Sequence, residues 1–420
     1  MNEKLIALRR EFHRYPESGW TEFRTTVRII EELERLELPV RYGKAIHAPE
    51  KMHGLPAPEV LERCYERALA ETNRPDLLEE MHFGFTGCVT VIEGDLPGDT
   101  VGLRVDIDCN EVTESREASH VPVAEGFRSV HEGLMHACGH DAHITIGLGA
   151  AKLLCENRHR LRGRVVLAFQ PAEEGLRGAA SLAAAGVFDD CRKLYGIHVG
   201  LLNAPVGTVA ASVTGVLASS KFDVAFHGKA AHAALSPELG RNALAAAAKA
   251  TLDMLAIPPI PGCVSRINVG TLHGGSGRNV IPAEAVLQAE TRASTTRDNE
   301  QLSAEAMRRC QAAAAHYGCT CEIMPMGGAD DGVCDEALAA RAAEVLQGVP
   351  GVTTVLPSTE LSICEDITTL MAAVRARGGQ ATELIAAMPL TAPHHNDRFD
   401  VDERVIELGV RILGSLVLEA

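Results

Sequence analysis

Apolar positions change their spacing along this chain, and the change predicts alternating helices and strands. Spacings of three and four residues predict two helices within 3–37, joined by a turn at 15–19, with Trp20 starting the second. Short β-branched runs predict strands, and a turn at 97–99 separates the first two. These strands are 89–92, 100–105, 164–169 and 194–198. Strands alternating with helices indicate an α/β core, which a proline-rich insertion at 44–82 decorates.

The pattern changes near residue 214. Four predicted strands and two predicted helices then follow the order β-α-β-β-α-β, which is typical of a ferredoxin-like unit. The strands are 221–226, 264–272, 284–291 and 321–326, and the helices are 240–256 and 297–317. At 420 residues the chain exceeds what one core usually supports. We therefore predict a mixed-sheet α/β domain formed by 1–213 and 330–420, with a ferredoxin-like domain inserted at 214–329.

Composition narrows the class of protein. The chain has 40 basic and 56 acidic residues, a formal net charge of -16, which disfavours binding to nucleic acid or to a membrane surface. No apolar run is long enough to span a bilayer. Twelve cysteines follow no regular spacing, and the first residues lack the apolar core of a signal peptide. We expect a protein of a reducing, cytoplasmic compartment.

The densest chemistry lies at 135–143, where three histidines, a cysteine and an aspartate precede an apolar run. Thiolate, imidazole and carboxylate are the groups that bind first-row divalent ions. The spacing Cys138-x-His140 lets two such donors converge from one bend of the backbone. The alternative is a polar loop before a buried helix, with histidines that are only hydrogen-bonded.

Further donors follow other predicted strands, and this favours a metal site. Glu173 and Glu174 follow the strand at 164–169, His198 stands at the exit of the strand at 194–198, and a pair of histidines occupies 394–395. Adjacent carboxylates repel each other unless a positive charge compensates them. A metal ion supplies that charge, so one glutamate can ligate while its neighbour acts as a general base. Acidic residues at a helix N-terminus are a compatible alternative.

Three weaker candidates accompany these donors. Asp108 follows the strand at 100–105 and is suited to orient a ligating histidine. His232 stands on a loop of the inserted domain, where a lone histidine is weak evidence. The glycine-rich stretch 274–282 lacks the Gly-Lys-Ser ending of a phosphate loop, so we interpret it as a tight turn that presents Arg278 and Asn279.

Together these motifs resemble the M20 metallopeptidase family, in particular its amidohydrolase branch. The stretches that carry the resemblance are 9–13, 106–108, 136–141, 170–175, 228–232, 279–282 and 365–366. The resemblance implies two divalent metal ions, manganese or zinc, with Glu173 as the general base. The ligands that it implies are Cys138, His140, Glu174, His198 and His395. Either histidine of the pair at 394–395 can ligate, and the position of Phe399 favours His395.

The resemblance also implies that the inserted domain is a lid that forms a homodimer. His232 would then stabilise the oxyanion in the partner's site, and Asn279 would lie near an acyl-amino acid substrate. We hypothesise that Arg278 pairs with a substrate carboxylate, because a guanidinium matches that geometry. Arg292 is a second candidate, with a structural salt bridge as its more ordinary role. Two alternatives stay open: a hydrolase of other N-acyl or N-aroyl amino acids, and a supporting chain for a homologous second subunit.

Overall fold

The structure is a computed structural model that describes residues 2–419, and it divides the chain into two compact units. The first unit comprises Met1–Gly215 and Val333–Ala420, and the second comprises Val216–Gly332. The sequence predicted these boundaries at 214 and 329. No helix of the described residues is long and apolar enough to cross a membrane.

The first unit is built on an eight-stranded mixed sheet with the order β1-β2-β4-β3-β5-β16-β6-β14. The strands are β1 (Val40–Tyr42), β2 (Cys88–Glu93), β3 (Leu96–Asp106), β4 (Arg162–Gln170), β5 (Cys191–Asn203), β6 (Thr208–Ala210), β14 (Thr354–Leu356) and β16 (Gln380–Met388). The central strands β4, β3, β5 and β16 are parallel neighbours. Their carboxyl ends therefore share one edge of the sheet, which is where α/β proteins usually bind ligands.

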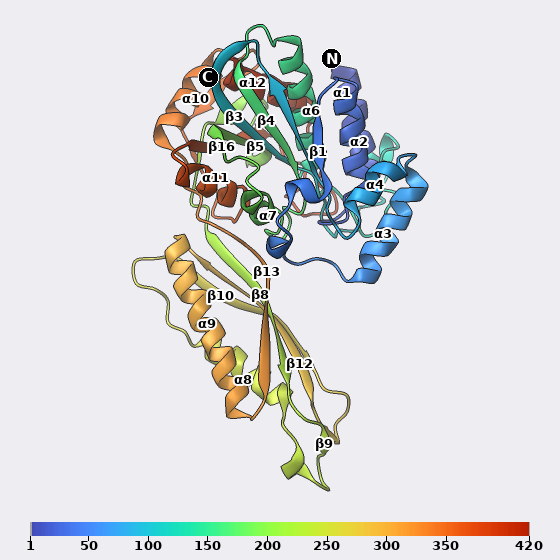
Figure 1. The fold of residues 1–420 in the computed structure, drawn as a ribbon, viewed down its shortest axis with the longest axis vertical. Helices are drawn as coiled ribbons and strands as arrows, with labels where there is room; N and C mark the ends of the chain where they lie inside the picture. The colour runs from blue at the N-terminus through green and yellow to red at the C-terminus, as the bar shows by residue number, and fades with distance from the viewer. Residues whose placement is uncertain (1, 420) are drawn as a thin grey trace. The chain divides into compact units, whose positions relative to one another are not determined.

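Helices cover both faces of this sheet, because its central strands are apolar on both sides (Figure 1). In β4, Val165 and Leu167 belong to the larger core, while Val166 and Ala168 face the smaller one. The larger core is closed by α1 (Asn2–Arg14), α2 (Phe23–Glu34), α6 (His140–Glu156), α10 (Glu336–Gln347) and α12 (Arg404–Leu418). The smaller core is closed by α7 (Ala179–Ala184) and α11 (Ile367–Ala376). The unit is thus a three-layer α/β/α sandwich.

Three local predictions were wrong. Residues 97–99 are not a turn between neighbouring strands, because β3 begins at Leu96 and pairs with β4 and β5 rather than with β2. Trp20 precedes α2, which begins at Phe23, and Trp20 has a left-handed backbone with φ of 67°. His198 lies inside β5 rather than at its exit, because pairing with β16 continues past it.

The insertion between β1 and β2 contains two helices, α3 (Pro58–Glu71) and α4 (Pro75–Met81), with two short 3-10 turns before them. The sequence predicted the first of these helices at 59–70. The insertion is tied to the first unit by polar contacts: the Trp20 indole donates to the His53 carbonyl at 2.8 Å, and Ser181 Oγ accepts from the Ala48 amide at 3.2 Å. It is therefore part of the first unit rather than a separate excursion.

The second unit contains a four-stranded antiparallel sheet with the order β10-β12-β8-β13. Its main elements are β8 (Ala218–His227), α8 (Ala243–Leu255), β10 (Ser265–Gly274), β12 (Glu284–Ala293), α9 (Thr296–His316) and β13 (Thr320–Ala329). Alternate residues of β12 are buried, so one face of the sheet packs on the helices. The chain order is β-α-β-β-α-β, as the sequence predicted.

Candidate metal centre

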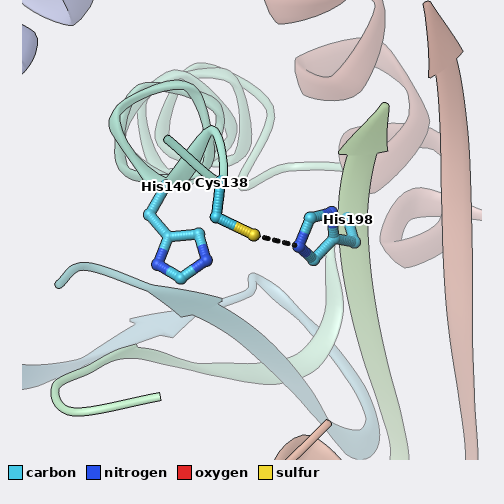
Figure 2. Close-up of side chains that lie close together, drawn as sticks. All are labelled: Cys138, His140 and His198. Carbon is cyan, nitrogen blue, oxygen red and sulfur yellow. Dashed lines mark hydrogen bonds between the residues drawn. The ribbon is translucent and has the colours of Figure 1, made fainter. Parts of the chain in front are cut away.

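The donor residues gather at the carboxyl edge of the central strands (Figure 2). Cys138 lies in the loop just before α6, His140 is the first residue of α6, and His198 comes from β5. The Cys138 Sγ lies 3.5 Å from the His198 Nε2, and all three side chains are almost completely buried. A buried site of this kind favours a cation only where several donors converge on it.

Both buried imidazoles present the same nitrogen to this site. The His140 Nδ1 lies 2.9 Å from the Asp108 carbonyl oxygen, and the His198 Nδ1 lies 2.9 Å from the Val199 carbonyl oxygen. A carbonyl oxygen only accepts, so each Nδ1 carries a proton and each Nε2 is the ring nitrogen left to face the site. The Nε2 of His140 is buried without a partner. A buried ring nitrogen without a partner, beside a thiol, is what a metal ion would satisfy once the ring is neutral.

Gly139 brings Cys138 and His140 together. Its φ of 87° is in the left-handed region, and it stands directly before α6. A Cβ at this position would lie 2.9 Å from a methyl carbon of Val199. Burial raises the pKa of the Cys138 thiol to about 12, so without a cation the sulfur keeps its proton. Cation binding here therefore requires loss of that proton.

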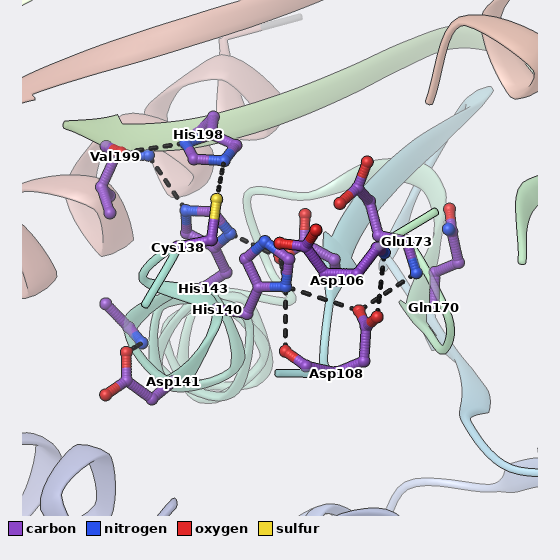
Figure 3. A network of polar contacts seen from close by, with 12 residues as sticks. Asp106, Asp108, Cys138, His140, Asp141, His143, Gln170, Glu173, His198 and Val199 are labelled. Carbon is purple, nitrogen blue, oxygen red and sulfur yellow. Dashed lines mark hydrogen bonds and ion pairs between the residues drawn. The ribbon is translucent and has the colours of Figure 1, made fainter. Parts of the chain in front are cut away.

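A strained turn after β4 presents the two adjacent glutamates, and Figure 3 shows the first of them, Glu173, beside Asp108. The carboxylate of Asp108 accepts the Glu173 amide at 3.0 Å and the Glu174 amide at 2.9 Å. The buried Glu22 carboxylate accepts the amide of Ala172 at 2.7 Å, and Ala172 has a left-handed φ of 53°. Three consecutive amides are thus held by carboxylates, which stabilises an unfavourable backbone conformation.

Glu173 lies in strongly acidic surroundings. Its burial, followed by the nearby charges of Glu365, Glu174 and Asp366, raises its pKa well above the ordinary value for a glutamate. For Glu174, burial acts in the same upward direction, but contacts with His395 and His140 outweigh it and lower the pKa. One carboxyl of the pair therefore tends to hold a proton while its neighbour stays ionised, which is the division between a proton carrier and a ligand.

The two C-terminal histidines differ in what they face. His395 has a left-handed φ of 62°, and its Nε2 lies 3.4 Å from Glu174 Oε1. His394 instead turns its Nε2 to the Val199 carbonyl at 3.3 Å. Ligand atoms of Cys138, Glu174 and His395 lie within 4.8 Å of one another, and those of Cys138, His140 and His198 do likewise. Cys138 thus belongs to two neighbouring donor groups, an arrangement suited to a pair of cations.

His143 is, with His136, one of two histidines of the 135–143 cluster to which the sequence assigned no role. The Val199 amide donates to its Nε2 at 2.9 Å, and its Nδ1 lies 2.5 Å from Asp106 Oδ1. Because the Nε2 lone pair is occupied, His143 cannot ligate without breaking the bond that holds β5 next to His198. Arg104 in turn contacts Asp106 at 2.7 Å and Asp366 at 2.9 Å. Side chains alternate along a strand, so the sequence already placed Arg104 and Asp106 on one face of β3. This was the signal from which their pairing could have been predicted.

The remaining predicted residues lie in the second unit. His232 stands on the short strand β9 (Ala231–His232), and its Nδ1 accepts the amides of Ala234 and Leu235, each at 3.2 Å. Arg278 and Asn279 are exposed on the turn that precedes β11 (Val280–Ile281). The guanidinium of Arg292 lies 3.1 Å from the Glu290 carboxylate within β12, in line with the structural salt bridge considered above.

Residues 102–419 match the sequence pattern of Peptidase family M20/M25/M40. The chain is 40% identical to one of the subunits of the p-aminobenzoyl-glutamate hydrolase of Escherichia coli (strain K12), over 99% of this chain and 95% of that protein. It is also 40% identical to "Indole-3-acetyl-aspartic acid hydrolase" of Enterobacter agglomerans, over 98% and 94%. Among solved structures, the aminobenzoyl-glutamate utilization protein from Klebsiella pneumoniae matches with a TM-score of 0.85 and 35% identity, over 99% of this chain and 95% of that one.

Proposed function

The chain belongs to peptidase family M20/M25/M40, and on that premise we propose that it is a metal-dependent amidohydrolase of p-aminobenzoyl-glutamate, releasing p-aminobenzoate and glutamate. The observation that carries the proposal is the free Nε2 of His140 beside Cys138, next to the buried Glu173. Its substrate rests on the 40% identity to a hydrolase of that name along nearly the whole chain.

The donor set fits two divalent ions, which we propose are manganese or zinc. The residues that would hold them are Cys138, His140, Glu174, His198 and His395. Thiolate and imidazole suit zinc, whereas carboxylates also suit manganese. Bound divalent ions would activate a water molecule for attack and neutralise charge that develops on the carbonyl oxygen. Asp108 positions this set, because it holds both His140 and the backbone of the Glu173 turn.

Glu173 is the proton carrier of this proposal. Its side chain is only 6% exposed, and its raised pKa makes it able to accept a proton and release it again. It would take a proton from the attacking water and return it to the leaving amide nitrogen. Without that return, the amine would leave as an unfavourable anion, so one residue serves both transfers.

The second unit has the element order of a ferredoxin-like fold, and we propose that it is a lid through which two chains form a homodimer. His232 would then donate to the oxyanion in the partner's site, and Asn279 would contact the substrate. Arg278 would pair with a substrate carboxylate, with Arg292 as a weaker candidate. Arg278→Ala should raise KM for a glutamate amide far more than for a neutral acyl amino acid, whereas equal effects on both would contradict the assignment.

Two alternative functions compete with this one. Hydrolysis of another N-acyl amino acid is favoured by the equal identity to an indole-3-acetyl-aspartic acid hydrolase. A supporting role beside a homologous second chain is suggested by the name of the Escherichia coli relative, which describes it as one subunit of its hydrolase. Against a purely supporting role, the chain retains Glu173 together with the complete donor set.

The experiment is to measure release of p-aminobenzoate by the purified chain alone, after chelation and again after manganese or zinc is restored. Metal-dependent release supports the proposal. Glu173→Gln should lower kcat by roughly 10³-fold with metal content unchanged, because it removes the proton carrier but no ligand. If the metal-loaded chain releases no p-aminobenzoate but cleaves indole-3-acetyl-aspartate, the second substrate class is the correct one. Activity only in the presence of a homologous second chain would support the heteromeric alternative.

A further inference from the structure

Arg177 differs from the other arginines around the metal centre in having no acidic partner among residues 2–419. Arg104 lies within 3.2 Å of three carboxylates, and Arg9 lies 2.8 Å from both Asp141 and Asp400. Arg177 bonds only to carbonyl oxygens among the described residues. A half-buried guanidinium near so many carboxylates would ordinarily pair with one of them, so its isolation needs an explanation.

The Arg177 side chain is held in one place by its surroundings. Its Nε donates to the carbonyl of Glu174 at 2.8 Å, and its Nη1 donates to the carbonyl of Gly54 at 2.9 Å. It also packs against a glycine: a Cβ on Gly19 would lie 2.4 Å from Nη2. The guanidinium is therefore fixed against the turn that carries Glu174. Because the side chain is already ordered, binding a ligand would cost little further conformational entropy.

The unused donors of Arg177 form an anion-binding group. A guanidinium has five N–H bonds, of which one on Nε and one on Nη1 are occupied. The rest belong to Nη1 and Nη2, and the residue that carries them is partly exposed to solvent. A planar pair of N–H donors with a full positive charge matches a carboxylate in a two-pronged geometry.

We propose that Arg177 binds a carboxylate of the amino-acid half of the substrate, an inference that rests on the proposed amidohydrolase function. For Glu173 to protonate the leaving nitrogen, that nitrogen must lie beside the turn at Glu173 and Glu174. In a glutamate amide, one carboxylate lies next to this nitrogen and a second ends the side chain. A cation fixed to the Glu174 carbonyl is placed to meet one of them.

The test compares wild type with Arg177→Gln on three substrates: p-aminobenzoyl-glutamate, its side-chain amide p-aminobenzoyl-glutamine, and its α-amide p-aminobenzoyl-isoglutamine. We expect Arg177→Gln to raise KM for the dicarboxylate by roughly 10- to 100-fold, with a smaller change in kcat. On the amide that lacks the carboxylate bound by Arg177, wild type and variant should have equal KM. Which amide behaves so identifies the carboxylate.

Two further variants separate binding from support of the turn. Arg177→Lys keeps the positive charge but not the planar pair of donors, and should give a smaller rise in KM with the same substrate selectivity. Arg164→Gln is the matched control, because Arg164 belongs to the same unit and already pairs with Asp190 at 2.8 Å. Metal content of each variant is measured in parallel. An Arg177→Gln defect of equal size on all three substrates would overturn the proposal and reduce Arg177 to a support of the turn.

Calorimetric binding of L-glutamate to the metal-loaded chain decides the inference independently of turnover. Affinity that falls by roughly 10-fold or more in Arg177→Gln, but not in Arg164→Gln, supports it. Unchanged affinity overturns it. If wild type releases no p-aminobenzoate, but Arg177→Gln still binds glutamate more weakly than wild type, the proposed substrate is wrong while the carboxylate site is supported.

Discussion

His13 gives the first unit a pH-dependent stability that can be measured directly. Its Nδ1 lies 2.8 Å from Asp141 and its Nε2 lies 3.0 Å from Glu114, inside a fully buried environment. A carboxylate only accepts, so the ring must donate from both nitrogens and carries a positive charge. Burial by itself lowers the pKa of His13, but the bonds to Asp141 and Glu114 outweigh it and raise the pKa from 6.5 to about 9.

The sign of the effect follows from that direction. A group whose folded pKa is raised contributes stability that is fully present below its unfolded pKa of 6.5 and is lost as pH rises through about 9. The shift from 6.5 to about 9 corresponds to roughly 3 kcal/mol of unfolding free energy. Over this window Asp141 and Glu114 are ionised in the folded protein, because their folded pKa values are lowered, and ordinary carboxyl groups are ionised in the unfolded chain as well, so the change at this cluster belongs to His13.

The perturbation is His13→Asn, and the assay is urea unfolding of the chelated protein followed by the fluorescence of Trp20. Trp20 is the only tryptophan of the chain and is fully buried in the first unit, so it reports that unit. We expect the free energy of unfolding of wild type to exceed that of the variant most near pH 6. This difference should shrink by roughly 3 kcal/mol by about pH 10. His159→Asn, at an exposed histidine, should leave the pH dependence unchanged. Free energies of wild type and His13→Asn that run parallel across the window would refute the reasoning.

Three further perturbations test the site itself. Asp108→Asn removes a carboxylate that accepts two backbone amides, and should lower kcat/KM and metal affinity by roughly 10- to 100-fold, measured by amide cleavage and competition with a chelator. His143→Gln should weaken metal affinity by a similar factor with the circular dichroism spectrum retained; an unchanged affinity would show that the Val199 contact does not position His198. Because the Cys138 thiol has a pKa of about 12, metal binding should release its proton, and affinity should fall about tenfold per unit of decreasing pH. Calorimetry in buffers of different ionisation enthalpy measures that proton, and its absence in Cys138→Ala is the control.

Much of the donor chemistry could be predicted from the sequence, because it depends on neighbours in the chain. Cys138 and His140 flank one glycine, and Glu173 and Glu174 follow a β-branched run, so their types and spacing already indicate a metal site. The periodicity change near 214 likewise predicted the β-α-β-β-α-β order of the second unit. Both patterns involve residues that are close together in the chain, so they can be recognised without knowledge of the fold.

The protonation and pairing of these groups were decided only by the tertiary structure. Nothing near His143 in the chain indicates that the Val199 amide occupies its Nε2, and nothing near Arg104 indicates Asp366 as a partner. The isolation of Arg177 likewise depends on Gly19 and Gly54, which belong to distant segments. The parallel strands bring such segments to one edge of the sheet, where polar groups that are distant in the sequence come into contact. A side chain's identity is a property of the sequence, whereas its partner is a property of the fold.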